Sequence, residues 1–132
     1  MKIENHLENL KESIREIEEA ITKGLEEKQR TLAFHASSAA ADMLEIILHK
    51  NNLVDMGFIF KHEWLNSKNI IKEKISFDFP KKIEIIDLMM KIEAVRNPLC
   101  YGRRREAEEL ILLVEDFNKL RKLFEEVSGY GL

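Results

Sequence analysis

Hydrophobic residues recur along this chain at steps of three and four, which is the spacing of one face of an α-helix. The first such stripe runs from Ile3 to Leu25, and Gly24 is the first residue expected to end it. A second stretch, over about residues 26–50, has an apolar face that includes small side chains, which let a neighbouring backbone approach closely. The pattern predicts two successive helices, of which the second lies at the centre of a bundle.

Residues 53–79 are harder to assign, because two aromatic segments within them, 57–60 and 75–79, partly alternate as strands do. Two short strands are one interpretation. We favour two short helices, around residues 59–65 and 67–74, because Ser67 is a suitable N-cap for the second of them.

Two prolines are expected to bound the next helix. Pro80 is tolerated in a first turn, so we expect it to open a helix that Asp78 caps and in which Ile83 joins the buried face. Pro98 is expected to end or kink this helix, because Asn97, the residue before it, is biased out of the α conformation.

A final amphipathic stripe runs over residues 107–127, and residues 128–132 are expected to fray. Four amphipathic helices joined by short connections can bury their apolar faces only against one another. We therefore predict an all-α fold in a single domain over residues 1–132. Its architecture would be an up-and-down bundle of four main helices plus a short irregular or helical segment.

Composition narrows the function classes. The 132 residues include 21 Lys+Arg and 24 Asp+Glu, a net charge of −3, which argues against a globally basic nucleic-acid binder but leaves room for a local basic patch. The one cysteine, Cys100, cannot form an intrachain disulfide, as is usual in a reducing cytoplasm. No run approaches the roughly 20 apolar residues of a membrane span, and no apolar signal core opens the chain. We expect a cytoplasmic protein that does not enter the membrane.

Polar residues of the second helix also recur at steps of three and four, and they form one stripe opposite its apolar face: His35, Ser38, Asp42, Glu45 and His49. A solvent-facing ridge is the expected arrangement, because such stripes are common on exposed helix faces. The alternatives are a metal or acid–base site, or a cleft formed with a partner chain. No ligand pair here has independent support, so we predict neither a metal nor a cofactor.

Other known catalytic and metal-binding motifs are incomplete or absent in this sequence. His62 opens a segment similar to the zincin helix, but Asn66 stands where a second His must bind zinc. The chain has neither a phosphate-binding glycine loop nor a Gly-x-Ser-x-Gly elbow. Cys100 has no His close in sequence to act as its base, so we expect a buried structural thiol.

The most informative stretch, residues 96–105, contains four arginines and no acid: Arg96, Arg103, Arg104 and Arg105. If the last helix begins near Arg103, these cations oppose its dipole. Ion pairs with Glu108 and Glu109 are one compensation, at about 0.2–0.5 kcal/mol each. The other is a phosphate or RNA backbone docked against the guanidinium groups.

Arg96-Asn97 followed by Leu99, between the last two long helices of a small bundle, resembles the HEPN superfamily (higher eukaryotes and prokaryotes nucleotide-binding domain). Helical order and length are similar over nearly the whole chain, whereas the specific motif covers only residues 96–101. The family signature is an Arg, often followed by a polar residue, and then a His after four to six residues. Arg96 and Asn97 match its start, but Tyr101 stands where the His would be.

The resemblance implies a homodimer in which Arg96 and Asn97 line a cleft at the two-fold interface, where active members cleave RNA without a metal. Tyrosine, with a pKa of about 10, is a poorer proton shuttle at neutral pH than imidazole, whose pKa is about 6.5. The usual endonuclease activity is therefore not expected. Some members pair with a small nucleotidyltransferase as toxin and antitoxin. Those carry a modifiable Tyr two residues beyond the His, where this chain has Arg103.

We therefore predict a module that binds RNA, a nucleotide or a partner protein through residues 96–105. Arg96 would contact phosphate, Asn97 would orient it, and Tyr101 would stack or hydrogen-bond, while the three arginines that follow add charge. One alternative is a diverged metal-independent endoribonuclease, in which His35 supplies acid–base catalysis. The other is a purely structural interaction protein whose arginines close ion pairs.

Overall fold

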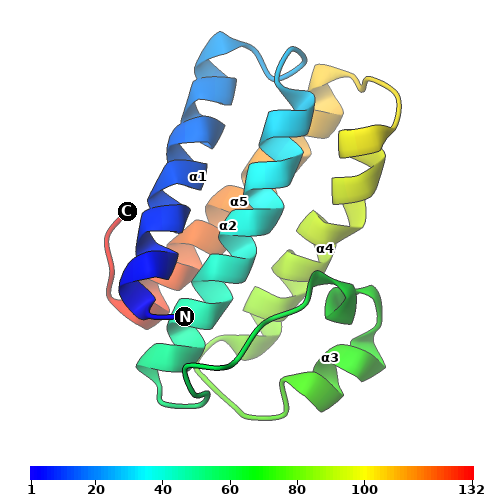
Figure 1. The fold of residues 1–132 in the computed structure, drawn as a ribbon. Coiled ribbons are helices and arrows are strands. Elements are labelled where there is room, and N and C mark those ends of the chain that lie inside the picture. The colour runs from blue at the N-terminus through cyan, green and yellow to red at the C-terminus, as the bar shows by residue number, and fades with distance from the viewer.

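Four long helices form an up-and-down bundle in the computed structural model, which describes residues 1–132: α1 (Ile3–Lys23), α2 (Gln29–Lys50), α4 (Lys82–Tyr101) and α5 (Ala107–Ser128) (Figure 1). Between α2 and α4 the chain forms a 3-10 helix, η1 (His62–Asn66), and a short helix, α3 (Lys68–Lys74). These two elements lie at the end of the bundle where α2 ends and α4 begins. The structure contains no strand, so the predicted all-α bundle is confirmed.

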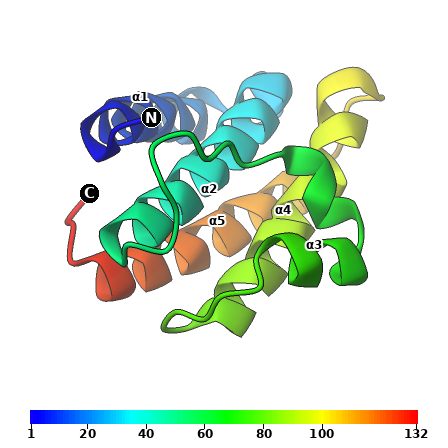
Figure 2. The same cartoon turned by 60° about the horizontal axis from the view of Figure 1, so that its bottom comes forward.

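The helix at the centre is α2, which packs against α1, α4 and α5 (Figure 2). Its small residues, such as Ala36 and Ala40, let the neighbouring helices approach, and the larger Met43 and Ile47 are buried among them. α2 is also the one helix long and apolar enough to cross a membrane. Within the bundle, 67% of its most apolar stretch is buried, as expected for the core helix of a helical bundle.

Two helix boundaries predicted from the sequence are confirmed by backbone geometry. Gly24 ends α1 at a φ of 123°, which a side chain would disfavour, and its N–H donates to the Ala20 carbonyl. The Ser67 hydroxyl caps α3 by accepting a hydrogen bond from the Ile70 N–H. Residues 53–79 therefore contain the favoured short helices and not strands.

The predicted start of α4 is wrong. The helix begins after Lys81, which adopts a left-handed conformation at a φ of 62° and gives no side-chain cap. Asp78 accepts a hydrogen bond from the Phe79 N–H and so stabilises the turn before the helix. Ile83, predicted to be buried, is 74% exposed, whereas Ile86 and Met89 of the same predicted stripe are buried.

Pro98 was predicted to end or kink α4, and a helix end at Pro98 is wrong, since the helix continues through it to Tyr101. Pro98 lacks the N–H that would bond the carbonyl of Ala94, but Ala94 is exposed, so water can satisfy that carbonyl. The two residues after Pro98, Leu99 and Cys100, are buried and hold this last turn against the core. The buried thiol agrees with the structural role predicted for it.

The C-terminal tail packs on the bundle, contrary to the expected fraying. Lys50 donates a hydrogen bond to the Ser128 carbonyl, and its ammonium group lies 4.5 Å from the centroid of the Tyr130 ring. Arg121 donates to the Leu132 carbonyl at 2.7 Å. The tail composition alone could not reveal these contacts, because the lysine comes from α2.

Candidate anion-binding site

The polar stripe of α2 does not form the predicted solvent-facing ridge, because α1 covers part of it. Nδ1 of His35 lies 3.1 Å from the Ser13 hydroxyl oxygen, and Asp42 accepts a 2.8 Å hydrogen bond from His6. Both Ser13 and His6 are buried residues of α1, so that helix uses polar as well as apolar positions for packing. His35 thus contacts α1, whereas its neighbour Phe34 contacts Arg96.

The arginine-rich stretch lies where α4 ends and α5 begins. Arg96 and Asn97 belong to the last turns of α4, and residues 102–106 form the connection to α5. Because α5 begins at Ala107 and not near Arg103, the arginines lie outside its first turn, which instead holds acidic residues. The expected conflict with the helix dipole is therefore absent.

Gln29, the first residue of α2, fixes this connection. Its side chain is 1% exposed, and Nε2 donates hydrogen bonds of 3.0 Å to the carbonyls of both Leu99 and Arg103. Its Oε1 accepts a 2.8 Å hydrogen bond from the Arg105 N–H. One amide thus satisfies three backbone groups of an irregular turn. Local spacing could not identify Gln29, since its partners lie at least 70 residues away in the chain.

A pocket of about 320 Å³ opens beside Gln29, between the start of α2 and the end of α4. The residues that line it include no acid: Gln29, Arg30, Leu99, Cys100, Tyr101, Gly102 and Arg104. The Arg30 guanidinium lies 5.9 Å from the centroid of the Tyr101 ring. Neither Arg30 nor Arg104 forms an ion pair, so the pocket carries uncompensated positive charge.

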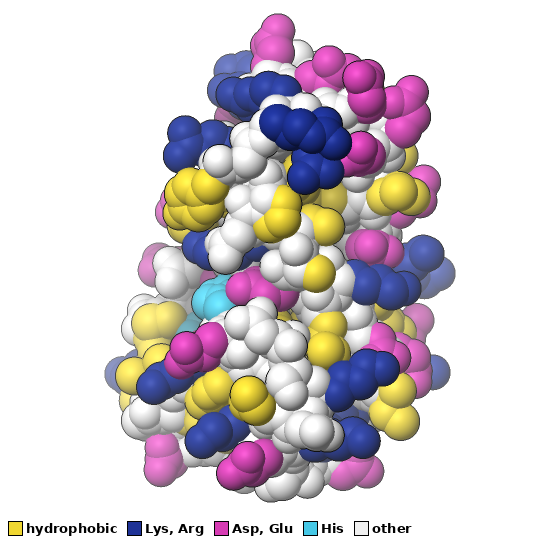
Figure 3. Space-filling model, turned by 90° about the vertical axis from the view of Figure 1, so that its right-hand side faces the viewer, with side chains coloured by type: hydrophobic (Ala, Val, Ile, Leu, Met, Phe, Trp, Pro, Cys, Tyr) yellow, Lys and Arg dark blue, Asp and Glu magenta, His cyan; other side chains and the backbone are white.

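Only one of the arginines predicted from sequence is neutralised by an ion pair. Arg105 pairs with Glu109 at 3.1 Å. Arg103 is exposed and donates only to the carbonyl of Arg104. The NH1 group of Arg96 donates to the Asn97 side-chain oxygen at 3.2 Å, and its buried Nε has no partner. Figure 3 shows Lys and Arg side chains near the upper end of the face that α4 contributes to, next to Asp and Glu side chains, and further Lys and Arg side chains lower on the same face.

Side-chain contacts continue from this pocket along the line where α2 and α4 meet, one helical turn at a time. Phe34 is 47% exposed, and the Arg96 guanidinium lies 5.9 Å from its ring centroid. One turn further, the Ser37 hydroxyl donates a 2.7 Å hydrogen bond to Oε2 of Glu93. Nδ1 of His62 lies 3.2 Å from the same oxygen. We call this line of residues the α2–α4 seam; it consists of Phe34, Ser37, His62, Glu93 and Arg96.

His62 and Glu93 have the arrangement of an acid–base pair. Because Nδ1 of His62 donates to Glu93, the other ring nitrogen is free to exchange a proton. Burial by itself would raise the pKa of Glu93, but hydrogen bonds from His62 and Ser37 and the charge of Arg96 outweigh it and hold the pKa below its ordinary value. Local spacing could not identify this pair, since 31 residues separate its members.

Comparison of this chain with protein-family models, with curated proteins and with solved structures finds no match. The function proposed below therefore depends on the geometry of the site and on the motif at residues 96–101.

Proposed function

We propose that this protein is a HEPN-like helical module that binds the phosphate groups of single-stranded RNA or of a nucleotide at the end of the bundle. The observation that carries the proposal is the acid-free pocket beside Gln29, in which Arg30 and Arg104 have no ion pair and Tyr101 offers an exposed ring. Guanidinium groups bind phosphate through paired hydrogen bonds, and unpaired bases stack on aromatic rings.

The pocket and the α2–α4 seam together support binding of more than one nucleotide. Tyr101 beside Arg30 and Phe34 beside Arg96 place two exposed aromatic rings next to two guanidinium groups. Single-stranded nucleic acids are bound by this combination of stacking and charge. Asn97 is exposed next to Arg96 and is available for hydrogen bonding to the backbone or a base.

Fluorescence anisotropy with a short labelled single-stranded RNA tests this function. We expect saturable binding, weakened about tenfold by each of Arg30→Ala, Arg96→Ala and Arg104→Ala, as for the loss of one charged hydrogen bond. Lys119→Gln, an exposed cation midway along α5, is the matched control and should bind as the wild type does. If replacing Arg96, Arg103, Arg104 and Arg105 by Ala together has no effect except a lower melting temperature, only the purely structural alternative remains. RNA binding that these replacements leave unchanged would contradict the proposed site.

The same proposal includes a cytoplasmic homodimer, and a small nucleotidyltransferase as a partner in a toxin–antitoxin pair. Support comes from the resemblance at Arg96 and Asn97 and from the apolar rings that the seam exposes beside it, Phe34 and Tyr101. Sedimentation equilibrium tests the dimer, and a strictly monomeric mass would remove it. A neighbouring reading frame that encodes a small nucleotidyltransferase would support the pair.

A second candidate function, metal-independent RNA cleavage, is favoured by the contact between His62 and Glu93. In such a reaction the RNA 2′-oxygen attacks the adjacent phosphorus and His62 accepts the hydroxyl proton. The bond from phosphorus to the 5′-oxygen breaks, that oxygen takes a proton from solvent water, and the product is a 2′,3′-cyclic phosphate. Arg96 would stabilise the charge on the phosphorus oxygens. Cleavage in excess EDTA that is lost in both His62→Gln and Arg96→Ala would establish it. Loss in His35→Gln alone would instead support the acid–base residue predicted from sequence.

A further inference from the structure

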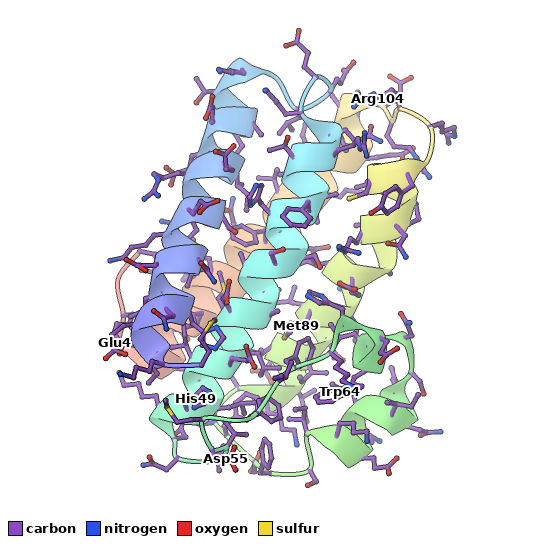
Figure 4. The ribbon with its side chains drawn as sticks, viewed as in Figure 1. Glu4, His49, Asp55, Trp64, Met89 and Arg104 are labelled. Carbon is purple, nitrogen blue, oxygen red and sulfur yellow. The ribbon has the colours of Figure 1, made fainter.

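A second polar cluster lies far from the arginines, toward the other end of α2. It consists of His6 from α1 with Asp42 and Glu45 from α2, and one nitrogen or oxygen atom from each lies within 4.8 Å of the others. His6 is 2% exposed, and the side chains of Asp42 and Glu45 are 14% and 12% exposed. Figure 4 shows His49, one turn beyond Glu45, near this end of the bundle and Arg104 at the opposite end.

A carboxylate lies beside each ring nitrogen of His6, but only one of the two nitrogens forms a hydrogen bond. Its Nδ1 donates a 2.8 Å hydrogen bond to Oδ1 of Asp42. Its Nε2 lies 3.1 Å from Oε2 of Glu45, yet the geometry makes no hydrogen bond, and this buried nitrogen has no other partner. Two ligand atoms on one tetrahedral metal ion lie roughly 3.4 Å apart, so this spacing fits two atoms that face a common ion.

The cluster also lacks positive charge. His6 is the only basic group within ion-pair distance of Asp42 or Glu45, and no Lys or Arg pairs with either carboxylate. One imidazole can supply a single positive charge to two carboxylates. Buried charges are unfavourable unless they are paired or coordinate a metal, so a divalent cation would balance the cluster.

A further histidine stands one turn away. His49 follows Glu45 by four residues on the same face of α2, and its ring centroid lies 6.0 Å from that of His6. Its Nε2 is buried and has no hydrogen-bond partner. The remaining carboxylate oxygen of Glu45 accepts a 3.0 Å hydrogen bond from the Phe60 N–H, which fixes the orientation of the carboxylate.

We propose that Nε2 of His6 and Oε2 of Glu45 bind a divalent transition-metal ion of the Zn²⁺ class, with water or His49 completing the coordination, while Asp42 accepts the hydrogen bond from Nδ1 of His6 and orients the imidazole. Imidazole nitrogen together with carboxylate oxygen suits such an ion better than Mg²⁺ or Ca²⁺, which prefer oxygen ligands throughout. The ion would join α1 to α2. Through the hydrogen bond from Phe60 to Glu45 it would also hold the segment before η1. Its role is structural and independent of the arginine pocket.

The test uses the full chain without an affinity tag, stripped of metal with EDTA and then dialysed. Isothermal titration with ZnCl₂ should show one saturable site, and added Zn²⁺ should raise the melting temperature, because an ion that binds only the folded state stabilises it. Asp42→Asn and Glu45→Gln should each bind Zn²⁺ at least about tenfold more weakly.

His35→Gln is the matched control, since His35 also joins α2 to α1 but through Ser13 and outside the cluster. It should bind Zn²⁺ as the wild type does. Circular dichroism identifies any variant that fails to fold. The rise in melting temperature of the wild type with Zn²⁺ tests the proposal even if a variant is unfolded. Absence of saturable binding to the wild type, or wild-type affinity in a folded Glu45→Gln variant, overturns the proposal.

Discussion

Gln29 shows how one buried side chain sets the shape of the candidate site. Its amide forms hydrogen bonds with two carbonyls and one N–H of residues on both sides of Gly102. These groups lie in an irregular turn, where no helical hydrogen bond pairs them. The backbone at Arg103 and Arg105 is thereby fixed, although their side chains remain at the surface. The arginines of the connection are thus presented by a preorganised backbone, which lowers the entropy lost when an anion binds.

Gln29→Ala removes these three hydrogen bonds and leaves two carbonyls and one N–H without partners. We expect the free energy of unfolding, measured by urea denaturation, to fall by about 2–3 kcal/mol. RNA binding should weaken as well, although no arginine has changed. Asn118→Ala, at an exposed position of α5, should alter stability by less than about 0.5 kcal/mol. A Gln29→Ala variant as stable as the wild type would show that the amide does not hold the turn.

Glu93 should make stability depend on acidic pH. Because its folded-state pKa lies below the ordinary value of 4.5, the ionised carboxylate stabilises the fold fully at pH values above 4.5. That stabilisation is lost as the pH falls through the lower folded-state pKa. We expect Glu93→Gln to lower the free energy of unfolding at neutral pH and to make its decline toward about pH 3 shallower.

Urea denaturation at a series of pH values measures this difference. Glu115→Gln, at an exposed position of α5, is the control and should leave the pH profile parallel to that of the wild type. If Glu93→Gln and the wild type lose stability in parallel as the pH falls, the hydrogen bonds of Glu93 do not stabilise its charged form.

At the scale of elements, the turn between α4 and α5 depends on the absence of a side chain at Gly102. A Cβ atom there would lie 2.3 Å from the Pro98 carbonyl oxygen, the same oxygen that accepts the Gly102 N–H. We expect Gly102→Ala to lower the free energy of unfolding by about 2 kcal/mol and to lower the melting temperature. Gly131→Ala, where a Cβ meets nothing within 4 Å, should change neither.

Helical periodicity predicted the long helices because each of them buries a continuous stripe, as Leu10, Ile14 and Ile17 do on α1. It was least reliable where a helix boundary depends on solvent access. Pro98 disfavours a helix locally, but its missing hydrogen bond falls at the carbonyl of Ala94, an exposed residue, and the buried residues after Pro98 hold the last turn. Tertiary packing thus outweighed a local preference that is correct on average.

The candidate site was predictable only in part. Local spacing identified Arg96 and the arginines after it, because they are contiguous in sequence. Arg30 and Gln29 could not be found in that way, since they join the site only when α2 packs against α4. For the same reason the periodicity of α2 placed its polar residues on one face but could not show that His6 would cover them.

For the whole molecule, the distribution of charge matters more than its total. The net charge of −3 would repel RNA if it were spread evenly over the surface. Arg30 and Arg104 instead line one pocket without acids, and Arg103 is exposed in the same connection, while paired cations such as Lys23 lie elsewhere. Screening restricts each surface charge to about 8–10 Å at physiological salt, so an approaching phosphate senses the local arginines more than the distant carboxylates.

The salt dependence of RNA binding should therefore measure how many phosphates these arginines contact. Four arginines in the pocket, the seam and the connection to α5 lack ion pairs with acids: Arg30, Arg96, Arg103 and Arg104. Each phosphate contact to a single strand contributes a slope of about −0.7 to log K against log salt. We expect an overall slope of about −2 to −3 from anisotropy titrations between low and physiological salt, and Arg104→Ala should reduce its magnitude by about 0.7. The Lys119→Gln control should leave the slope unchanged. A slope near zero, or one that Arg104→Ala does not alter, would mean that the arginines do not contact phosphate, because counterions are released only where phosphates are neutralised.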